Sequence, residues 1–388
     1  MGVFAGPEIT ESGLVLALDG ANFKSFKGEA TTNELLDITW VGDGGGTGTL
    51  VTDNNLRYNG YPTYYYTPGS SLNSYLNGAD VDAARTSTVW TFSCYVKRQD
   101  GAPITSLDVY MYYPSSDGSA AGTIQDVGNG WYRVSRTRTG ASSYISLCGF
   151  TGFASGVKYY LSGAQLEKKS YTTTYVSTNT TRGTTVATGG GWADLSANEN
   201  NGELVNGVRE NSNNLGSLSF DGSDDYIQLA GTILSLNQMT ISSWNFSSNF
   251  NQNGFMFEKT TNGIVNTQYS LFYNSSNDIY YRTYGLSTLD LTINITTAGV
   301  VNNQWNNVVA TFDGTIKRIY VNGVLAATST TLSGTVTQNT TGAAFIGIYG
   351  GGGYPFNGRI AQTQIYNRAL SAQEIQQNFN ATRSRFSI

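Results

Sequence analysis

Ala310-Thr-Phe-Asp-Gly-Thr-Ile-Lys-Arg-Ile-Tyr-Val-Asn-Gly-Val-Leu-Ala-Ala-Thr328 is the stretch that decides the fold class. Two dipeptides, Asp313-Gly314 and Asn322-Gly323, interrupt short runs in which apolar and polar residues alternate. Asp-Gly and Asn-Gly readily take the positive φ angles that two-residue hairpin turns need. The preceding run also alternates and places Val308, Ala310 and Phe312 on one face. Residues 305–328 are therefore predicted to form three antiparallel strands, each with one buried face.

The composition extends this prediction to the whole chain. It has 388 residues, of which 39% are hydrophobic and only 13% are charged, and it contains 46 glycines and 26 tyrosines. A chain of this length can bury the cores of two ordinary domains, and this composition suits sheets joined by many turns. We predict an all-β protein made of two β-sandwich (jelly-roll) domains.

One short helix is predicted near the C-terminus. Ser371 and Glu374 have the spacing of a capping box, and Leu370, Ile375 and Phe379 lie on one side of a helix over residues 371–379. We expect this apolar side to dock on the edge of a sheet.

The region between residues 29 and 188 has its own strand patterns. In Trp90–Lys97 the alternation places Trp90, Phe92, Cys94 and Val96 inward, which predicts a second sandwich. Cys94 and Cys148 both lie in apolar strand patterns. They are either buried free thiols or bridged to each other.

Charge and residue types exclude several classes of function. The net charge of −5 argues against nucleic acid as a partner. The absence of histidine excludes triad hydrolases and histidine–zinc enzymes, because the usual general base and metal ligand are missing. No membrane insertion is expected, because no run of 18 apolar residues occurs. The N-terminus lacks the pattern of a signal peptide, so we expect any exit from a cell to occur by assembly and lysis or on a dedicated route.

Four stretches of the C-terminal half carry the features of a known family: Trp192–Leu204, Leu218–Tyr226, Trp305–Phe312 with its hairpins, and Gly358–Ser371. They resemble the laminin-G-like, concanavalin A-like jelly roll that is common in phage virion proteins. The N-terminal stretch Ser12–Asn22 resembles the opening strand of the same jelly roll.

This resemblance implies a discontinuous domain. Residues 1–28 plus 189–388 are predicted to form one sandwich, and residues 29–188 a second jelly roll inserted into its first loop, which is tolerated when the termini of the insertion lie close together. The alternative is two tandem domains with a boundary near Thr185.

The inserted region resembles the carbohydrate-binding-module-like jelly rolls of phage tail and fibre proteins. The stretches that carry this resemblance are Trp90–Lys97, Asn129–Val134 and Ser162–Glu167, followed by Tyr175. Enzymes on concanavalin A-like sandwiches that cut β-glucans carry a Glu-x-Asp-x-Glu strand, and no such motif occurs here. We therefore expect no catalytic residues and no enzymatic activity.

Glycan binding is the activity that the resemblance implies, through aromatic rings that stack on sugars beside short polar groups. The glycine-rich stretch 349–356 lacks the alternating pattern of a strand, and its glycines let the backbone approach a ligand closely. Where two tyrosines are adjacent in a strand, one of the two rings points outward. The predicted glycan-binding residues are Tyr280, Arg282, Tyr284, Tyr349, Tyr354 and Phe356. The alternatives are that these rings pack in the core or serve a protein interface.

Asp224 and Asp225 are candidate calcium ligands, because carboxylate oxygens suit this ion. The alternative is that both carboxylates cap a turn by accepting hydrogen bonds from backbone amides. No other cofactor is expected.

The resemblances together imply a structural protein on a virion surface, as a head decoration, a head fibre or a tail-fibre component. Its expected partners are other virion proteins of the capsid or tail and a host-surface glycan, and we expect a homo-oligomer because exposed strand edges offer contact surface. A secreted or cell-surface bacterial adhesin is the alternative. A polysaccharide-degrading enzyme is a third hypothesis, which the missing histidines and carboxylate motif oppose.

Overall fold

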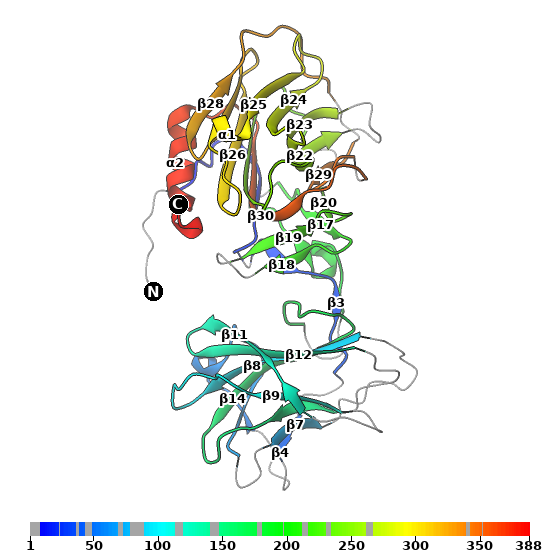
Figure 1. Cartoon of the computed structure of the whole chain (residues 1–388), viewed down its shortest axis with the longest axis vertical. Coiled ribbons are helices and arrows are strands. Elements are labelled where there is room, and N and C mark those ends of the chain that lie inside the picture. The colour runs from blue at the N-terminus through cyan, green and yellow to red at the C-terminus, as the bar shows by residue number, and fades with distance from the viewer. Residues whose placement is uncertain are drawn as a thin grey trace. The chain divides into compact units, whose positions relative to one another are not determined.

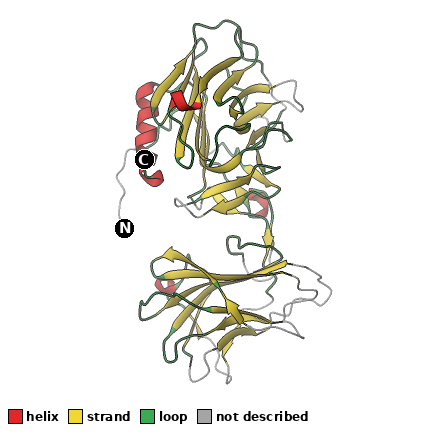
Figure 2. Ribbon diagram, in the orientation of Figure 1, coloured by secondary structure: helices red, strands yellow, loops and turns green. Residues whose placement is uncertain are grey.

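The computed structural model describes the chain except residues 1–7, 23, 36–38, 43–48, 69–72, 78–88, 113–118, 140–146, 177–180, 197, 212–215, 230–233, 261–266, 339–341 and 351. The chain divides into two compact units, one made of Met1–Ala30 with Gly183–Ile388 and the other of Thr31–Arg182. Strands dominate both units (Figures 1 and 2). The predicted all-β class of two sandwiches is confirmed.

The first unit is a sandwich of two sheets. Sheet A has the order β18-β19-β30-β21-β26-β27-β28, with β1 also paired to β30. Its strands are β1 Leu14–Asp19, β18 Arg209–Asn211, β19 Ser217–Asp221, β21 Met239–Phe246, β26 Trp305–Phe312, β27 Lys317–Val321, β28 Val324–Thr328 and β30 Asn357–Tyr366.

Sheet B has the order β2-β16-β17-β20-β29-β22-β23-β24-β25. Its strands are β2 Phe26–Gly28, β16 Gly191–Trp192, β17 Gly202–Val205, β20 Tyr226–Leu229, β22 Gly254–Thr260, β23 Thr267–Asn274, β24 Asp278–Thr283, β25 Asp290–Asn294 and β29 Ala344–Ile346. The core lies between the two sheets, with Ile241 and Val308 from sheet A and Leu271 and Tyr281 from sheet B all fully buried.

The predicted meander over residues 305–328 is confirmed as β26, β27 and β28, which pair antiparallel in that order. Asn322 and Gly323 form the second turn with φ angles of 50° and 79°, as a two-residue hairpin turn requires. The first connection is longer than predicted and spans residues 313–316. The reason is the Asp313 carboxylate, whose Oδ1 accepts hydrogen bonds from the amides of Thr315 (3.0 Å) and Ile316 (2.8 Å).

The predicted C-terminal helix is present as α2, Ala372–Thr382, with Ser371 as its N-cap and Glu374 completing the capping box. Ile375 and Phe379 are buried, as the pattern predicts. The predicted docking position is wrong, because α2 covers the outer face of sheet A rather than its edge. Phe379 stacks on Trp244 of β21 with 5.7 Å between the ring centroids, and β21 lies in the middle of the sheet.

The remaining helical segments of the described chain are short: α1 Ile295–Ala298 and three 3₁₀ turns, η1 Asn54–Leu56, η2 Val186–Thr188 and η4 Arg383–Phe386. A helix with the length and apolarity to span a membrane is not found among the described residues.

The second unit is also a sandwich. Sheet C has the order β10-β9-β13-β7-β4, sheet D the order β11-β12-β8-β14-β6-β5, and β3 pairs with β15. Its strands are β3 Thr31–Thr32, β4 Thr39–Gly42, β5 Thr49–Leu50, β6 Thr63–Tyr66, β7 Asn73–Asn77, β8 Val89–Arg98, β9 Asp108–Tyr112, β10 Ser119–Ala121, β11 Thr123–Gly128, β12 Trp131–Thr139, β13 Leu147–Thr151, β14 Tyr159–Glu167 and β15 Thr181–Arg182.

Strand β8 contributes four residues to the core of this second unit. Trp90, Phe92, Cys94 and Val96 are fully buried in it, which is the inward face that the alternation predicts. Cys94 and Cys148 are both free thiols in the buried core. Burial raises the pKa of both thiols well above its ordinary value, so they are inert core residues.

The chain passes from one unit to the other twice, and within each unit the two segments next to these crossings pair with each other. In the first unit β2 pairs with β16, and Gly28 lies opposite Gly191. In the second unit β3 pairs with β15, and Thr31 lies opposite Arg182. The compact second unit spans Thr31–Arg182, where the sequence analysis placed the insertion at residues 29–188.

Candidate functional site

An aromatic row lies on the outer face of sheet B. In β24 the residues alternate, so Tyr281 is fully buried in the core while Tyr280 and Arg282 face outward and are half-buried. Phe272 of β23 lies opposite Tyr280, with 5.1 Å between the ring centroids and an angle of 19° between the rings. Cross-strand neighbours of this kind share one face of a sheet and stabilise each other.

A bulge in β22 extends this row to a third strand. The pairing of β22 with β23 shifts between Phe255 and Phe257, so one extra residue, Met256, lies between them. Met256 and Phe257 both enter the core, and Phe255 lies opposite Phe272 on the outer face. The rings of Phe255 and Phe272 stack at 4.4 Å with an angle of only 6°.

The loop that follows β29 covers one end of the row. Tyr349 bridges to Gly353, and the ring of Tyr349 lies 4.9 Å from that of Phe255. The Gly350 amide donates to the buried carboxyl group of Glu258 at 2.6 Å, which holds the loop on sheet B. Tyr354 lies further along the loop, 6.4 Å from Phe255 and 5.9 Å from Tyr349 between ring centroids.

Only part of this aromatic surface is available to a ligand. Phe255 and Phe272 are 4% and 7% exposed, because their faces are stacked on each other and on their neighbours. Tyr354 is 53% exposed, and Tyr280 and Tyr349 are half-buried. The phenylalanines therefore form a floor, and the three tyrosines supply the open ring surface.

Tyr354 has an uncommon backbone conformation. Its φ angle is 48°, in the left-handed region that favours glycine. A bulky residue in this region is held there by its surroundings at a cost, and such residues concentrate at ligand-binding sites. About half of the Tyr354 side chain is exposed, so its ring is available to a ligand as well as to its aromatic neighbours.

Polar groups flank the aromatic row. Arg282 forms a bidentate ion pair with Asp290 of β25, with Nε–Oδ1 and Nη2–Oδ2 distances of 2.7 Å each. The hydrogen bonds to Asp290 raise the pKa of Arg282, so the guanidinium stays charged. Asn253 and Asn274 lie at the other side, where their carboxamide oxygens accept hydrogen bonds from the amides of Ser275 (3.1 Å) and Ser276 (2.5 Å).

These groups line an open pocket of about 370 Å³. This volume lies at the lower end of the range for small-molecule sites, roughly 300–1,000 Å³, and a largely aromatic wall with a few polar groups is typical of such sites. The lining residues are Asn253, Phe255, Phe272, Asn274, Tyr280, Arg282, Tyr349 and Tyr354.

The structure brings together four of the residues that the sequence analysis singled out: Tyr280, Arg282, Tyr349 and Tyr354. Tyr284 does not line the pocket and is half-buried beside it. The prediction that Phe356 binds a glycan is wrong, because its ring is fully buried, packs edge-on against Phe220 and cannot contact a ligand.

The floor of the pocket could not be predicted from the sequence. Phe255 and Phe272 show no signal of their own, because outward orientation of Phe255 depends on the bulge at Met256. Asn253 and Asn274 flank these strands and were not distinguished from ordinary turn residues.

The carboxyl groups of Asp221, Asp224 and Asp225 lie within 4.8 Å of one another, at the turn between β19 and β20. Burial raises the pKa of Asp225, whose two oxygens accept hydrogen bonds from the amides of Gly207 (2.6 Å) and Asp221 (2.9 Å). These bonds use the carboxylate as a turn cap, so the geometry favours that interpretation. Calcium binding by Asp224 and Asp225 stays a prediction.

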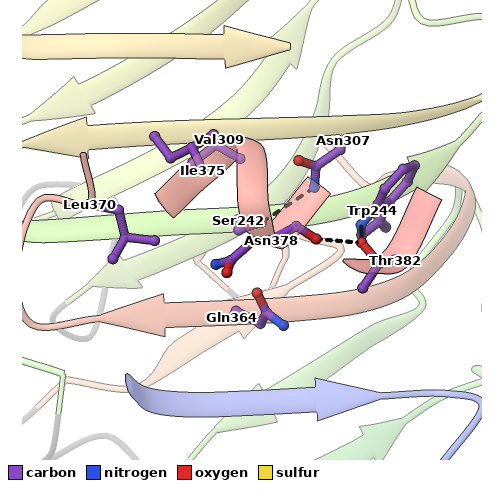
Figure 3. A pocket seen from close by; sticks show the side chains of 9 residues that line it. All are labelled: Ser242, Trp244, Asn307, Val309, Gln364, Leu370, Ile375, Asn378 and Thr382. Carbon is purple, nitrogen blue, oxygen red and sulfur yellow. Dashed lines mark hydrogen bonds between the residues drawn. The ribbon is translucent and has the colours of Figure 1, made fainter. Parts of the chain in front are cut away.

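A second cavity lies beneath helix α2 and is a packing feature. Figure 3 shows its lining side chains from β21, β26, β30 and α2, among them Trp244, whose Nε1 donates to the Thr382 hydroxyl at 3.1 Å. The cavity measures about 10 Å³, which is roughly the space that one water molecule needs. It has no room for a larger ligand.

Comparisons with known proteins concern the fold. No curated protein matches the chain. Among solved structures, the chain is similar to the receptor-binding domain of botulinum neurotoxin type G, with 15% identity, a TM-score of 0.36 and 48% of each chain covered. It is also similar to domain 4 of AbnA, a GH43 extracellular arabinanase from Geobacillus stearothermophilus, in complex with arabinotriose, with 16% identity, a TM-score of 0.37, 47% of this chain covered and 90% of the other.

The chain spans about half the length of the neurotoxin structure that it matches. One family model also matches part of the sequence, and its match covers strands β20–β30 and the first part of α2 together with every residue that lines the aromatic pocket. Residues 221–376 of this chain are similar to the concanavalin A-like lectin/glucanases superfamily.

Proposed function

We propose that this chain is a glycan-binding protein without enzymatic activity and that the pocket on sheet B is its binding site. The observation that carries this proposal is the open aromatic pocket, in which Tyr280, Tyr349 and Tyr354 line the same space as Arg282, whose guanidinium is paired with Asp290. Sugars present apolar C–H faces to aromatic rings and hydroxyl groups to hydrogen-bonding side chains, and this pocket offers both kinds of contact.

The chemistry of the pocket supports binding rather than hydrolysis. Retaining and inverting glycosidases both need two carboxyl groups that flank the scissile bond. Among the described residues that line the pocket, none is a carboxylic acid, and the neighbouring Asp290 holds both its oxygens against Arg282. The sequence also has no histidine that could replace a carboxyl group as general acid or base.

The first test is glycan binding by wild-type protein and by Tyr280→Ala. A ring contact is worth about 0.5–1.5 kcal/mol, so the substitution is expected to weaken binding by roughly 2- to 10-fold. Isothermal titration calorimetry with oligosaccharides selected on a glycan array gives the affinity.

Tyr226→Ala is the matched control for this test. Tyr226 is a half-buried tyrosine of the same sheet, it packs on Phe345 at 5.8 Å, and it does not line the pocket. Equal losses in both variants would contradict the proposed site, and release of reducing sugar by the wild-type protein would contradict the absence of enzymatic activity.

The proposed setting is the surface of a phage particle, as a head decoration, head fibre or tail-fibre component that assembles as a homo-oligomer. The support for this part is the resemblance of the C-terminal stretches and of the inserted region to virion proteins. Immunogold labelling of purified particles tests the location, and light scattering of the purified chain tests the oligomer. Absence of label from particles would favour a bacterial adhesin instead.

A further inference from the structure

We infer that the pocket on sheet B selects uncharged glycans and rejects those that carry carboxylate or sulfate groups. This inference rests on the proposed glycan binding and adds the class of ligand. It comes from how the charged side chains around the pocket are paired.

The positive charge of the pocket is already neutralised. Among the described residues that line the pocket, Arg282 is the one that carries a positive charge. Its Nε and Nη2 atoms both bind Asp290, so one of the two bidentate edges of the guanidinium is occupied and its charge is balanced by that carboxylate. An acidic sugar would have to displace Asp290 or bind the remaining Nη edge next to the Asp290 carboxylate.

Further carboxyl groups lie on the same face of the sheet. Cross-strand pairing places Glu258, Ser270, Arg282 and Asp290 in one row, so Arg282 lies between Ser270 and Asp290, and Glu258 follows beyond Ser270. Asp278 precedes Tyr280 on the outward face of β24 and lies opposite Asn274, which lines the pocket. Glu258 is fully buried and accepts from the Gly350 amide, so among the described residues of this row and its neighbours the carboxyl groups near a ligand are Asp278 and Asp290. Two carboxyl groups beside one guanidinium repel a negatively charged ligand.

Lys317 of β27 acts on Asp290 and Arg282 through its charge, but it does not line the pocket. Lys317 is 1% exposed, and its Nζ donates to the carbonyl groups of Thr288 (3.1 Å) and Leu289 (2.5 Å) on the core side of the sheet. Burial lowers its pKa to about 8. Its ammonium group is not accessible from the pocket.

An uncharged sugar fits the same groups without displacing any of them. The Arg282–Asp290 pair offers remaining N–H donors and carboxylate lone pairs side by side, and a hydroxyl group both donates and accepts. The Asn253 and Asn274 side chains add amide donors across the pocket. Hydroxyl pairs of a neutral sugar satisfy these groups while its C–H face lies on a tyrosine ring.

The test compares oligosaccharides that differ only in charge. Oligomers of glucose, galactose and mannose are titrated into the full-length protein beside the corresponding uronic acid oligomers, at 50 and 500 mM NaCl. We expect at least about a tenfold preference for the neutral member of each bound pair, and less than about a twofold change with salt because no ion pair forms with the ligand.

Asp290→Asn provides the decisive variant, because it frees the guanidinium of Arg282. Binding of the uronic acid oligomers is expected to rise by about tenfold or more and to become sensitive to salt. Asp313→Asn is the matched control: Asp313 pairs with Arg318 at 2.8 Å, is similarly exposed, lies in the turn between β26 and β27 and does not line the pocket. It should leave both ligand classes unchanged.

The outcomes separate the two proposals. Tighter binding of uronic acid oligomers by the wild-type protein, lost in Tyr280→Ala, would overturn the inference while glycan binding at this site holds. An Asp290→Asn protein with unchanged discrimination would also overturn it. Failure of every neutral and acidic oligosaccharide to bind would overturn the proposed function itself.

Discussion

At the scale of single residues, substitutions of Tyr354 distinguish the contribution of its ring to ligand binding from the effect of its backbone conformation on stability. It places an exposed ring on the pocket with a φ angle of 48°, where glycine is the residue that fits without cost. Tyr354→Gly is therefore expected to be more stable than Tyr354→Ala by about 1 kcal/mol, since alanine keeps the unfavourable backbone and loses the ring.

Both Tyr354 variants are expected to bind glycans more weakly than the wild type, by roughly 2- to 10-fold, because each lacks the ring. Urea unfolding gives the stabilities and calorimetry the affinities. If the glycine and alanine variants had equal stability, the backbone of residue 354 would not be strained. If both bound glycans as well as the wild type, the ring would not contact the ligand.

At the scale of elements, the start of helix α2 makes the attachment of the helix sensitive to pH. Glu374 accepts from the Ser371 amide at 2.9 Å and pairs with Arg368 at 2.7 Å, and the hydrogen bond from Arg368 is the main cause that lowers the pKa of Glu374 to about 2. A carboxyl group with a lowered pKa stabilises the fold above its ordinary pKa, about 4.3, and this contribution is lost as the pH falls toward 2.

The expected result is that Glu374→Gln is less stable than the wild type at pH 7 and that this difference shrinks as the pH falls from about 4.5 to 2. Tryptophan fluorescence during urea unfolding reports on it, because Trp244 stacks on Phe379 of this helix. A difference that is constant across this pH range would mean that the carboxylate charge contributes nothing.

At the scale of the whole molecule, the two compact units predict that residues 31–182 can be removed. Gly28 and Gly191 are paired neighbours in sheet B, so a short Gly-Ser linker can join the chain on either side of the deletion. The pocket lies entirely within the first unit, so the shortened chain that lacks residues 31–182 is expected to keep the glycan affinity of the full chain. Circular dichroism and calorimetry check fold and binding, and an unfolded product would show that the first unit depends on the second.

Local patterns in the sequence determined the strand class, the meander with its Asn322-Gly323 turn, the capped helix and the outward position of Tyr280 and Arg282. Each of these depends on residues close in the chain, through turn conformation or through a period of 2 or 3.6 residues.

The tertiary structure alone decided the pocket. The bulge at Met256 turns Phe255 outward, Tyr349 and Tyr354 pack against this residue of a strand about 90 residues earlier, and Phe356 enters the core. Register, bulges and loop contacts of this kind arise from pairing between distant segments, which local preferences do not encode. The docking of α2 on the face of sheet A has the same cause. The apolar side of a helix predicts that this side is buried, but it does not predict which strands the helix packs against.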